Sequence, residues 1–276
     1  MNLVVQGPGF AAARARELAR LCGATSCDAV ADSAFRLRGA SDEQAVKAWC
    51  ERHGLDWAWV PDGRRFAGLK LLAMDMDSTL IRIECIDELG AIAGRGAEIA
   101  AITASAMRGE IDYPESLRRR VALLAGLEAA ALQRVFDERL RLSPGAETLI
   151  ARCKRDGVKL LLVSGGFSFF ADRLKERLGF DFTVSNDLEI ARGRLTGKLS
   201  GSLVDGVGKK TKFLETLEEL NSPREKSVAI GDGANDLPMM MEAGYSVAYR
   251  AKPAVQAKAD CAINRCGLDA VANLFE

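Results

Sequence analysis

The sequence has little histidine, no excess of charge of either sign and no long apolar run. His53 is the single histidine among 276 residues, so phosphohistidine chemistry has little support. Lysine plus arginine and aspartate plus glutamate both total 38, so no overall field favours a nucleic acid or an acidic membrane surface. No stretch approaches the ~18 apolar residues of a membrane span, and the first residues lack a basic export segment. We expect no nucleic-acid partner, no membrane association and a cytoplasmic location.

The sequence also lacks a cysteine pattern that would indicate disulfide bonds. The seven cysteines are odd in number, scattered, and never separated by two residues, which predicts reduced and mostly structural thiols. Apolar residues make up 48% of the chain and charged residues 28%, as in ordinary soluble globular proteins. The length of 276 residues allows two domains.

The first 62 residues alternate short apolar runs with helical patterns. Their order is βαββαβ, which is found in ferredoxin-like α+β units and resembles the small ACT domains that often sense amino acids. Turn residues at 61–65 mark the linker, so we expect an ACT-like α+β domain at residues 1–62. Whether this domain binds an amino acid or mediates dimerisation is left open, and a homodimer is one option for the assembly. The apolar runs lie at 3–5, 27–30, 34–37 and 57–60, and the helical patterns at 10–22 and 42–53.

From residue 69 the pattern changes to strands that are followed by helices. Three continuous apolar runs, at 69–74, 158–163 and 227–230, each end in a polar or glycine-rich turn. Continuous apolarity suits strands that are buried on both faces of a parallel sheet. We therefore predict an α/β fold with a doubly wound parallel-sheet core at residues 69–276.

Two inserts interrupt this core. Residues 84–143 show helical periodicity and are too long for a simple crossover between strands, so they predict a helical cap over the strand ends. Residues 188–203 predict a hairpin, because Gly193 and Gly197 interrupt the apolar positions Leu195 and Leu199 as turn residues do.

Two carboxylates follow the first strand of the core, in Asp75-Met76-Asp77-Ser78-Thr79. On a turn they can converge on one point, and ligand sites in open α/β sheets lie at the carboxyl ends of the strands. Taken alone, the pattern also fits a solvated turn with an aspartate cap.

The turns after the other two strands carry complementary groups. Ser164-Gly165-Gly166 precedes a helix at 167–178, where a hydroxyl and unobstructed amides form a ready anion site. The segment 231–236 places two carboxylates and an amide on a glycine-rich turn, which suits Mg²⁺ with Asp232 as the leading ligand. Each segment alone could be a plain turn. Their joint occurrence after strands of one sheet makes coincidence improbable.

Together these segments and Lys209 resemble the haloacid dehalogenase superfamily of phosphotransferases, from about Leu69 onward. Lys210 and Lys212 compete with Lys209 locally, and only the whole set singles it out. Two further segments narrow the resemblance to the phosphoserine phosphatases: 83–89, which is similar to that family's acidic segment, and 113–121, which is similar to its cap segment. The first 62 residues lie outside this resemblance.

The resemblance implies a mechanism and a role for each matching residue. Asp75 would attack the phosphorus of O-phospho-L-serine and form an aspartyl phosphate, while Asp77 would act as acid and then as base. The product would be L-serine, in the last step of serine biosynthesis. The resemblance also implies Mg²⁺ binding by Asp75, the Asp77 carbonyl and Asp232, and phosphate binding by Ser164, Gly165, Lys209 and Asn235. Asp236 would orient Lys209 or a water bound to the metal.

Substrate recognition is implied for Glu84, which would bind the serine ammonium, and for Arg120, which would bind the carboxylate. Without the resemblance, Glu84 reads as a helix-start carboxylate and Arg120 as a surface cation. Arg118 and Arg119 adjoin Arg120, so the carboxylate ligand could be displaced by one or two places.

Two alternative functions stay open at this point. One is a related phosphatase, or a phosphotransferase that moves the phosphoryl group from another small phosphomonoester to an alcohol. The other is an amino-acid-sensing regulatory protein with an inert catalytic half. The second is disfavoured because Asp75, Asp77, Lys209 and Asp232 are all present.

Overall fold

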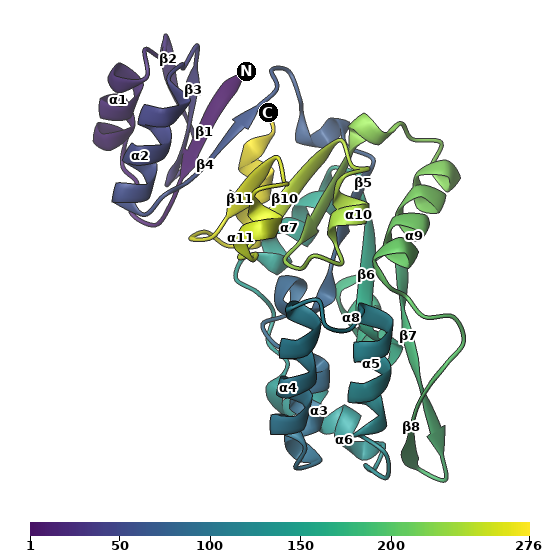
Figure 1. Ribbon diagram of the computed structural model, residues 1–276. Helices are drawn as coiled ribbons and strands as arrows, with labels where there is room; N and C mark the ends of the chain where they lie inside the picture. Colours follow the sequence, from purple (N-terminus) through teal and green to yellow (C-terminus); the bar gives the residue numbers. More distant parts are fainter.

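The computed structural model describes residues 1–276 and contains two β-sheets (Figure 1). The four-stranded sheet is formed by the first 60 residues, and the seven-stranded sheet by the rest of the chain. No helix is both long enough and apolar enough to cross a bilayer.

The N-terminal part has the βαββαβ order that the sequence predicts. Its antiparallel strands lie in the order β2-β3-β1-β4. The Asp42 side chain accepts a hydrogen bond from the Ala45 amide (3.0 Å) where the second helix begins, and Gly54 ends that helix in the left-handed conformation. The elements are β1 (Asn2–Gln6), α1 (Ala12–Leu21), β2 (Ser26–Ala31), β3 (Ala34–Arg38), α2 (Glu43–His53) and β4 (Asp56–Val60).

Both faces of this small sheet are covered. Successive residues of a strand point to opposite faces, and in β1 Leu3 and Val5 pack with α1 and α2. Val4, on the other face, joins Ala58 and Val60 in the hydrophobic core of the larger part. Figure 1 shows α1 and α2 on the side of the sheet that faces away from the C-terminal strands.

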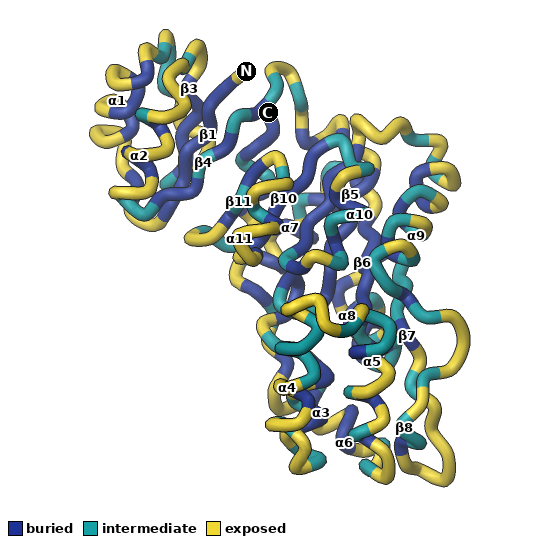
Figure 2. Tube along the Cα trace, viewed as in Figure 1, coloured by how far each residue is buried: buried dark blue, intermediate teal, exposed yellow.

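The larger part is built on a sheet with the strand order β11-β10-β9-β5-β6-β7-β8. Its pairs are parallel except β7 with β8, which is antiparallel. The central strand β5 is buried along its whole length, as its continuous apolarity predicts (Figure 2). The strands are β5 (Leu71–Met74), β6 (Lys159–Phe167), β7 (Phe182–Ala191), β8 (Arg194–Ser200), β9 (Ser227–Gly231), β10 (Tyr245–Tyr249) and β11 (Cys261–Ile263).

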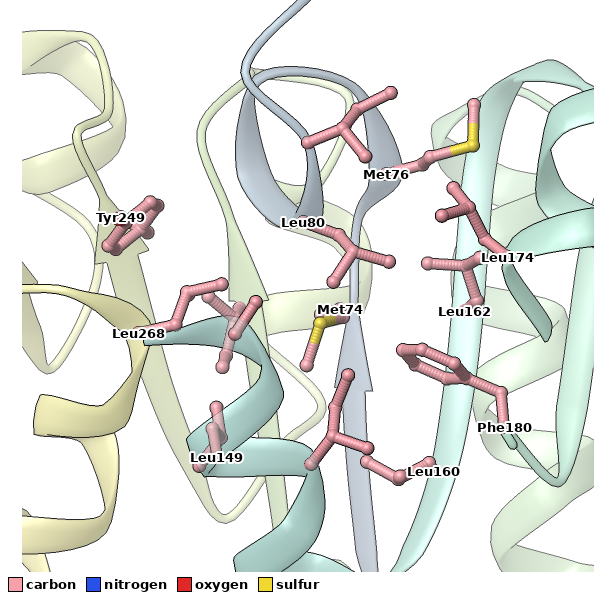
Figure 3. Close-up of a cluster of buried hydrophobic side chains, with 14 of the residues drawn as sticks. Met74, Met76, Leu80, Leu149, Leu160, Leu162, Leu174, Phe180, Tyr249 and Leu268 are labelled. Carbon is pink, nitrogen blue, oxygen red and sulfur yellow. The ribbon is translucent and has the colours of Figure 1, made fainter. Parts of the chain in front are cut away.

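Helices cover the two faces of this sheet. On one face, α7 (Ala146–Arg155) and α8 (Ser168–Leu178) pack against Met74, Leu160 and Leu162 (Figure 3). On the other face a second cluster joins the sheet to three further helices. The predicted doubly wound α/β core is therefore confirmed. The helices of the second face are α9 (Gly206–Glu219), α10 (Leu237–Met240) and α11 (Pro253–Gln256).

The insert between β5 and β6 is helical, as predicted, and lies beyond the carboxyl ends of the strands (Figure 1). It contains no strand, and its β-type pairings with neighbouring segments are isolated bridges. Its elements are α3 (Cys85–Ile92), α4 (Gly96–Met107), α5 (Tyr113–Ala122), α6 (Ala130–Arg134) and a π-helical segment (Val135–Arg139).

The second insert is the antiparallel pair β7–β8, which confirms the predicted hairpin. Its first strand begins earlier than the sequence indicates, because β7 pairs with β6 before it continues into the hairpin. Gly193 makes the turn with φ +75°, where a residue with a side chain would be strained.

Candidate active site

The predicted catalytic segments meet at one edge of the large sheet. Asp75 follows β5, Ser164 lies in the last part of β6, and Asp232 follows β9; β5 pairs with both other strands. A pocket of about 600 Å³ opens there between the sheet and the helical cap. Its lining includes, among the predicted residues, Asp75, Asp77, Glu84, Arg120, Gly165, Asp232 and Asn235.

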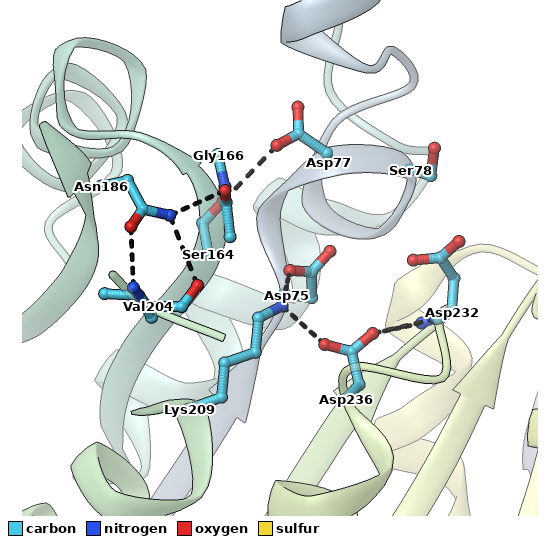
Figure 4. Close-up of polar contacts among 12 residues, drawn as sticks. Asp75, Asp77, Ser78, Ser164, Gly166, Asn186, Val204, Lys209, Asp232 and Asp236 are labelled. Atoms are coloured by element: carbon cyan, nitrogen blue, oxygen red, sulfur yellow. Dashed lines mark hydrogen bonds and ion pairs between the residues drawn. The ribbon is translucent and has the colours of Figure 1, made fainter. Parts of the chain in front are cut away.

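Lys209 lies beneath this pocket with its ammonium group completely buried. Its Nζ donates to Asp75 and, at 2.6 Å, to Asp236 (Figure 4). Burial alone would lower the pKa of Lys209, but the two carboxylates outweigh it and raise the pKa above its ordinary value. Lys210 and Lys212 instead pair with Glu242 and Glu215. The structure thus brings Lys209, and neither neighbouring lysine, to the site.

Asp236 supports the site from below. One of its oxygens accepts from Lys209, and the other accepts from the backbone amides of Asp232 (3.1 Å) and Gly233 (2.9 Å). These bonds hold the turn after β9 and the ammonium of Lys209 in one arrangement. The carboxylate of Asp232 is left free to face the pocket.

The acidic groups at the sheet edge fit a metal ion. Carboxylate oxygens of Asp75, Asp232 and Asp236 all lie within 4.8 Å of one another. Oxygen ligands of this kind suit a hard divalent cation. Because Asp236 already binds three N–H donors, Asp75 and Asp232 have the freer oxygens.

Burial and the neighbouring negative charges both raise the pKa of these carboxylates. Burial, opposed by Lys209 and reinforced by the neighbouring aspartates, raises the pKa of Asp75 well above its usual range. Burial and then Asp236 raise the pKa of Asp232 to about 6. A cation between the two would relieve both effects.

Asp77 stands beside the serine of the second segment. Its Oδ1 accepts from the backbone amide of Cys85 at 2.9 Å, and its Oδ2 accepts from the Ser164 hydroxyl at 3.5 Å (Figure 4). Burial raises the pKa of Asp77, which favours the neutral carboxyl that a general acid needs.

The helix predicted to follow Ser164-Gly165-Gly166 at 167–178 is confirmed to within one residue, because α8 spans Ser168–Leu178. The strand before it is longer than predicted, because β6 continues through Phe167 instead of ending at Val163. The Gly166 amide donates to the Ser164 hydroxyl at 2.8 Å. An anion bound here would contact the irregular last part of strand β6, where the Ser164 hydroxyl already accepts the Gly166 amide.

Glu84 lies at the cap side of the pocket. Its Oε1 accepts a hydrogen bond of 2.6 Å from the Ser78 hydroxyl, and Ser78 adopts a left-handed backbone conformation (φ +59°) that is uncommon for serine. Enclosure by the walls of the pocket, with repulsion from Asp77, raises the pKa of Glu84 to about 8, although the side chain still meets solvent within the pocket. The sequence analysis gave Ser78 no role, and its position beside Asp77 was the only signal available.

Arg120 is the one member of the arginine triplet that lines the pocket. Arg119 forms an exposed ion pair with Glu115, and Arg118 is also turned away from the lining. Of the three, Arg120 is thus the one placed where a bound molecule could contact it.

Two residues that no sequence motif marks hold the last part of strand β6 in place. The Tyr113 hydroxyl, from cap helix α5, donates to the Gly165 carbonyl at 3.0 Å. The same carbonyl accepts from Asn186 (2.9 Å), whose side chain also exchanges hydrogen bonds with the backbone of Val204 (Figure 4). Both residues bond a backbone atom far along the chain, which leaves no motif in the sequence.

Comparison with known proteins decides the family. The model of the haloacid dehalogenase-like hydrolases matches residues 72–241. The chain belongs to this family. A curated phosphoserine phosphatase from Polaromonas sp. is 54% identical over 217 residues, which cover 77% of this chain and 92% of the relative. This relationship places our haloacid dehalogenase-like hydrolase among the phosphoserine phosphatases.

Solved structures resemble this hydrolase over different shares of its length. A probable phosphoserine phosphatase from Vibrio cholerae, in unliganded form, superposes with a TM-score of 0.87 at 36% identity and covers 99% of this chain and 86% of its own. A structure described as a phospho-aspartyl intermediate analogue of phosphoserine phosphatase has a TM-score of 0.71 at 35% identity and covers 75% and 99%. A second family model, a domain of unknown function (DUF4072), matches residues 3–46.

Proposed function

We propose that this chain hydrolyses O-phospho-L-serine to L-serine and phosphate through a phosphorylated Asp75. The observation that carries the proposal is one pocket with two chemically different ends. Asp75 and Asp232 lie on the sheet side, while Glu84 and Arg120 lie on the cap side. A carboxylate and a guanidinium complement an ammonium and a carboxylate, the two charges of the amino-acid end of phosphoserine.

Asp75 acts as the nucleophile in this proposal. Its carboxylate attacks phosphorus in line; the P–O bond to serine breaks, and Asp77 gives its proton to the departing serine oxygen. Asp77 then accepts a proton from water as the water oxygen attacks phosphorus. The Asp75 carboxylate leaves as the free anion, so the cycle returns both residues to their starting state.

Negative charge accumulates on the transferring phosphoryl group and needs fixed positive partners. We propose that Asp75, the backbone carbonyl of Asp77 and Asp232 hold Mg²⁺, which would offset this charge when bound. Lys209 is in place to neutralise it from below, because its ammonium already contacts Asp75. Ser164, the Gly165 amide and Asn235 would hold the phosphate oxygens, and Asp236 would orient Lys209.

The cellular role follows from the proposed reaction and from the resemblance to the family. We propose that the chain completes serine biosynthesis in the cytoplasm. Release of phosphate from a panel of phosphomonoesters, with and without Mg²⁺, tests the reaction directly. A clear preference for another phosphomonoester, or transfer of the phosphoryl group to an added alcohol, would replace this proposal.

Glu84→Gln tests the assignment of the amino-acid end. A charged hydrogen-bonding group that the substrate encloses but leaves without a partner costs ~1–3 kcal/mol, so phosphoserine should exceed phosphoglycolate, which lacks the amine, by about tenfold or more in kcat/KM. Glu84→Gln keeps the size of the side chain and should erode this preference selectively. Glu88→Gln is the matched control, because Glu88 lies in helix α3, which Glu84 immediately precedes, but lies outside the pocket lining. An unchanged preference in Glu84→Gln would remove Glu84 from amine recognition while leaving a phosphatase.

A further inference from the structure

We propose that Ser116 is a further specificity-determining residue of this site, and that its hydroxyl donates a hydrogen bond to the carboxylate of the substrate beside Arg120. The inference rests on the proposed phosphoserine hydrolysis, since it concerns the amino-acid end of that substrate. Nothing in the sequence singles Ser116 out, because serine occurs commonly in helices of any kind.

The position of Ser116 on helix α5 is the first observation. Tyr113, Ser116, Leu117 and Arg120 all line the pocket, at spacings of three and four residues. Residues at these spacings share one face of a helix. Ser116 therefore lies one turn before Arg120, on the face of α5 that borders the pocket.

The second observation is that its hydroxyl has no partner. Ser116 is 1% exposed, and its Oγ makes no hydrogen bond within the protein. Serine in a helix often bonds the carbonyl of the preceding turn, but here the Asp112 carbonyl accepts only the Ser116 backbone amide (3.0 Å). A buried hydroxyl without a partner costs free energy. At a binding site, this cost is removed when a bound ligand supplies the missing hydrogen-bond acceptor.

Ser116 differs from the other buried polar groups without a partner in its place beside the pocket. Six residues have a buried side-chain nitrogen or oxygen without a partner, and Ser116 is the single one of them that lines the pocket. The others are Asn2, Trp59, Thr79, Thr183 and Tyr249. Ser116 is thus the place where an incompletely bonded polar group and the substrate site coincide.

The charges around the pocket indicate which end of the substrate the hydroxyl serves. Six carboxylates line the pocket, against two cations, Arg120 and Lys252. The ammonium group of the substrate has a surplus of acceptors, whereas its carboxylate has few donors. The Arg120 Nε contacts the Ser116 carbonyl at 3.4 Å, which keeps the two residues together. A carboxylate bound by Arg120 on this face would meet the Ser116 hydroxyl as a second donor.

Ser116→Ala tests the inference, with kcat/KM measured for phosphoserine and for phosphoethanolamine, which has the amine but no carboxylate. Where phosphoethanolamine turns over too slowly, its inhibition constant replaces kcat/KM. A hydrogen bond to a charged group is lost, so kcat/KM for phosphoserine should fall about tenfold or more, mainly through KM. The value measured for phosphoethanolamine should not change. Ser116→Thr keeps the hydroxyl and should retain most of the wild-type value.

Thermal unfolding separates this role from a structural one. Ser116→Ala removes an unpartnered hydroxyl and introduces the best helix former, so Tm should stay the same or rise while activity on phosphoserine falls. Thr183→Val is the matched control. It removes an unpartnered hydroxyl outside the pocket and should leave kcat/KM for both substrates unchanged.

The outcomes distinguish the inference from the proposed function. An active wild type whose kcat/KM for phosphoserine is unchanged in Ser116→Ala would overturn the inference alone. Equal losses on phosphoserine and phosphoethanolamine would overturn it as well, because Ser116 would not read the carboxylate. A wild type that does not hydrolyse phosphoserine would overturn the proposed function and this inference with it.

Discussion

At the scale of single residues, the site depends on a lysine that is completely buried between two aspartates. Desolvating three charged groups is costly, and their mutual attraction offsets that cost only when each keeps its partner. Asp75 can therefore be changed with less damage than Lys209, because Lys209 retains Asp236. Substitutions of Asp75 are accordingly the cleaner probes of chemistry.

Asp75→Asn should abolish phosphate release while leaving the fold intact, because an amide keeps the shape of the carboxylate and is a far weaker nucleophile. Acid quenching of the wild type during turnover, followed by mass spectrometry, should find phosphate on the peptide that contains Asp75. Appreciable activity of folded Asp75→Asn protein would exclude the covalent mechanism. Circular dichroism and Tm serve as the control for folding.

Removal of divalent cations should abolish activity, and Mg²⁺ should restore it, because Asp75 and Asp232 would otherwise repel the phosphoryl group. Ca²⁺ prefers more ligands and longer bonds, so it should restore activity poorly. Since bound cation relieves the repulsion among the carboxylates, Mg²⁺ should also raise Tm, and Asp232→Asn should lose that increase. Full activity in excess chelator would contradict the metal assignment.

The sequence could predict that the candidate catalytic groups lie together, because each follows a strand of the same sheet. Asp75 and Asp232 come directly after apolar runs, and parallel strands bring their carboxyl ends to one edge. Tyr113 and Asn186 could not be predicted in this way. Their hydrogen bonds reach the Gly165 carbonyl from 52 and 21 residues away, and a carbonyl is present at every position of the chain.

At the scale of secondary structure, the boundaries that the sequence misplaced are those decided by tertiary pairing. Serine and glycine are poor strand formers, so the pattern ends the second strand at Val163. The structure extends it, because Phe167 pairs with Asn186 after a register shift. The same tertiary contact makes β7 longer than the predicted hairpin.

A side-chain hydrogen bond from Tyr113 joins cap helix α5 to strand β6. Tyr113→Phe removes the bond to the Gly165 carbonyl, which is worth ~0.5–1.5 kcal/mol net, and should raise KM for phosphoserine by about two- to tenfold. Tyr245→Phe is the matched control, since the Tyr245 hydroxyl donates to the Trp59 carbonyl far from the pocket. Equal KM values for Tyr113→Phe and the wild type would show that this bond does not position the last part of strand β6 during catalysis.

At the scale of the whole molecule, the N-terminal part is packed against the hydrolase core along one face of its sheet. Val4 belongs to the large hydrophobic cluster, and the Gln6 side chain donates to the Ala270 carbonyl at 3.2 Å. Tyr245 of β10 bonds to Trp59 at the end of β4. The sequence predicted this part and its linker, but it could not predict the docking, because the docked face mixes Val4 with the buried polar residues Asn2 and Gln6.

Asp56, at the start of β4, is the strongest polar link between the two parts. Its carboxylate is nearly inaccessible and accepts backbone hydrogen bonds of 2.9–3.1 Å from Asn264, Arg265 and Cys266. Removal of this carboxylate would leave those amide donors buried without partners. The two parts should therefore unfold as one cooperative unit, with Asp56 contributing to the stability of both.

Asp56→Ala should lower the free energy of unfolding by about 3 kcal/mol, because three backbone amides lose their acceptor. Denaturant unfolding, followed by tryptophan fluorescence and by loss of activity, measures this directly, since all three tryptophans lie in the first 60 residues. Asp62→Ala is the control: its exposed pair with the N-terminal amine should contribute little, and stability should be unchanged. Coincident midpoints that shift together in Asp56→Ala support joint unfolding. A fluorescence transition that shifts while the activity transition stays at the wild-type midpoint would show that the N-terminal part unfolds on its own and that its docking does not stabilise the catalytic half.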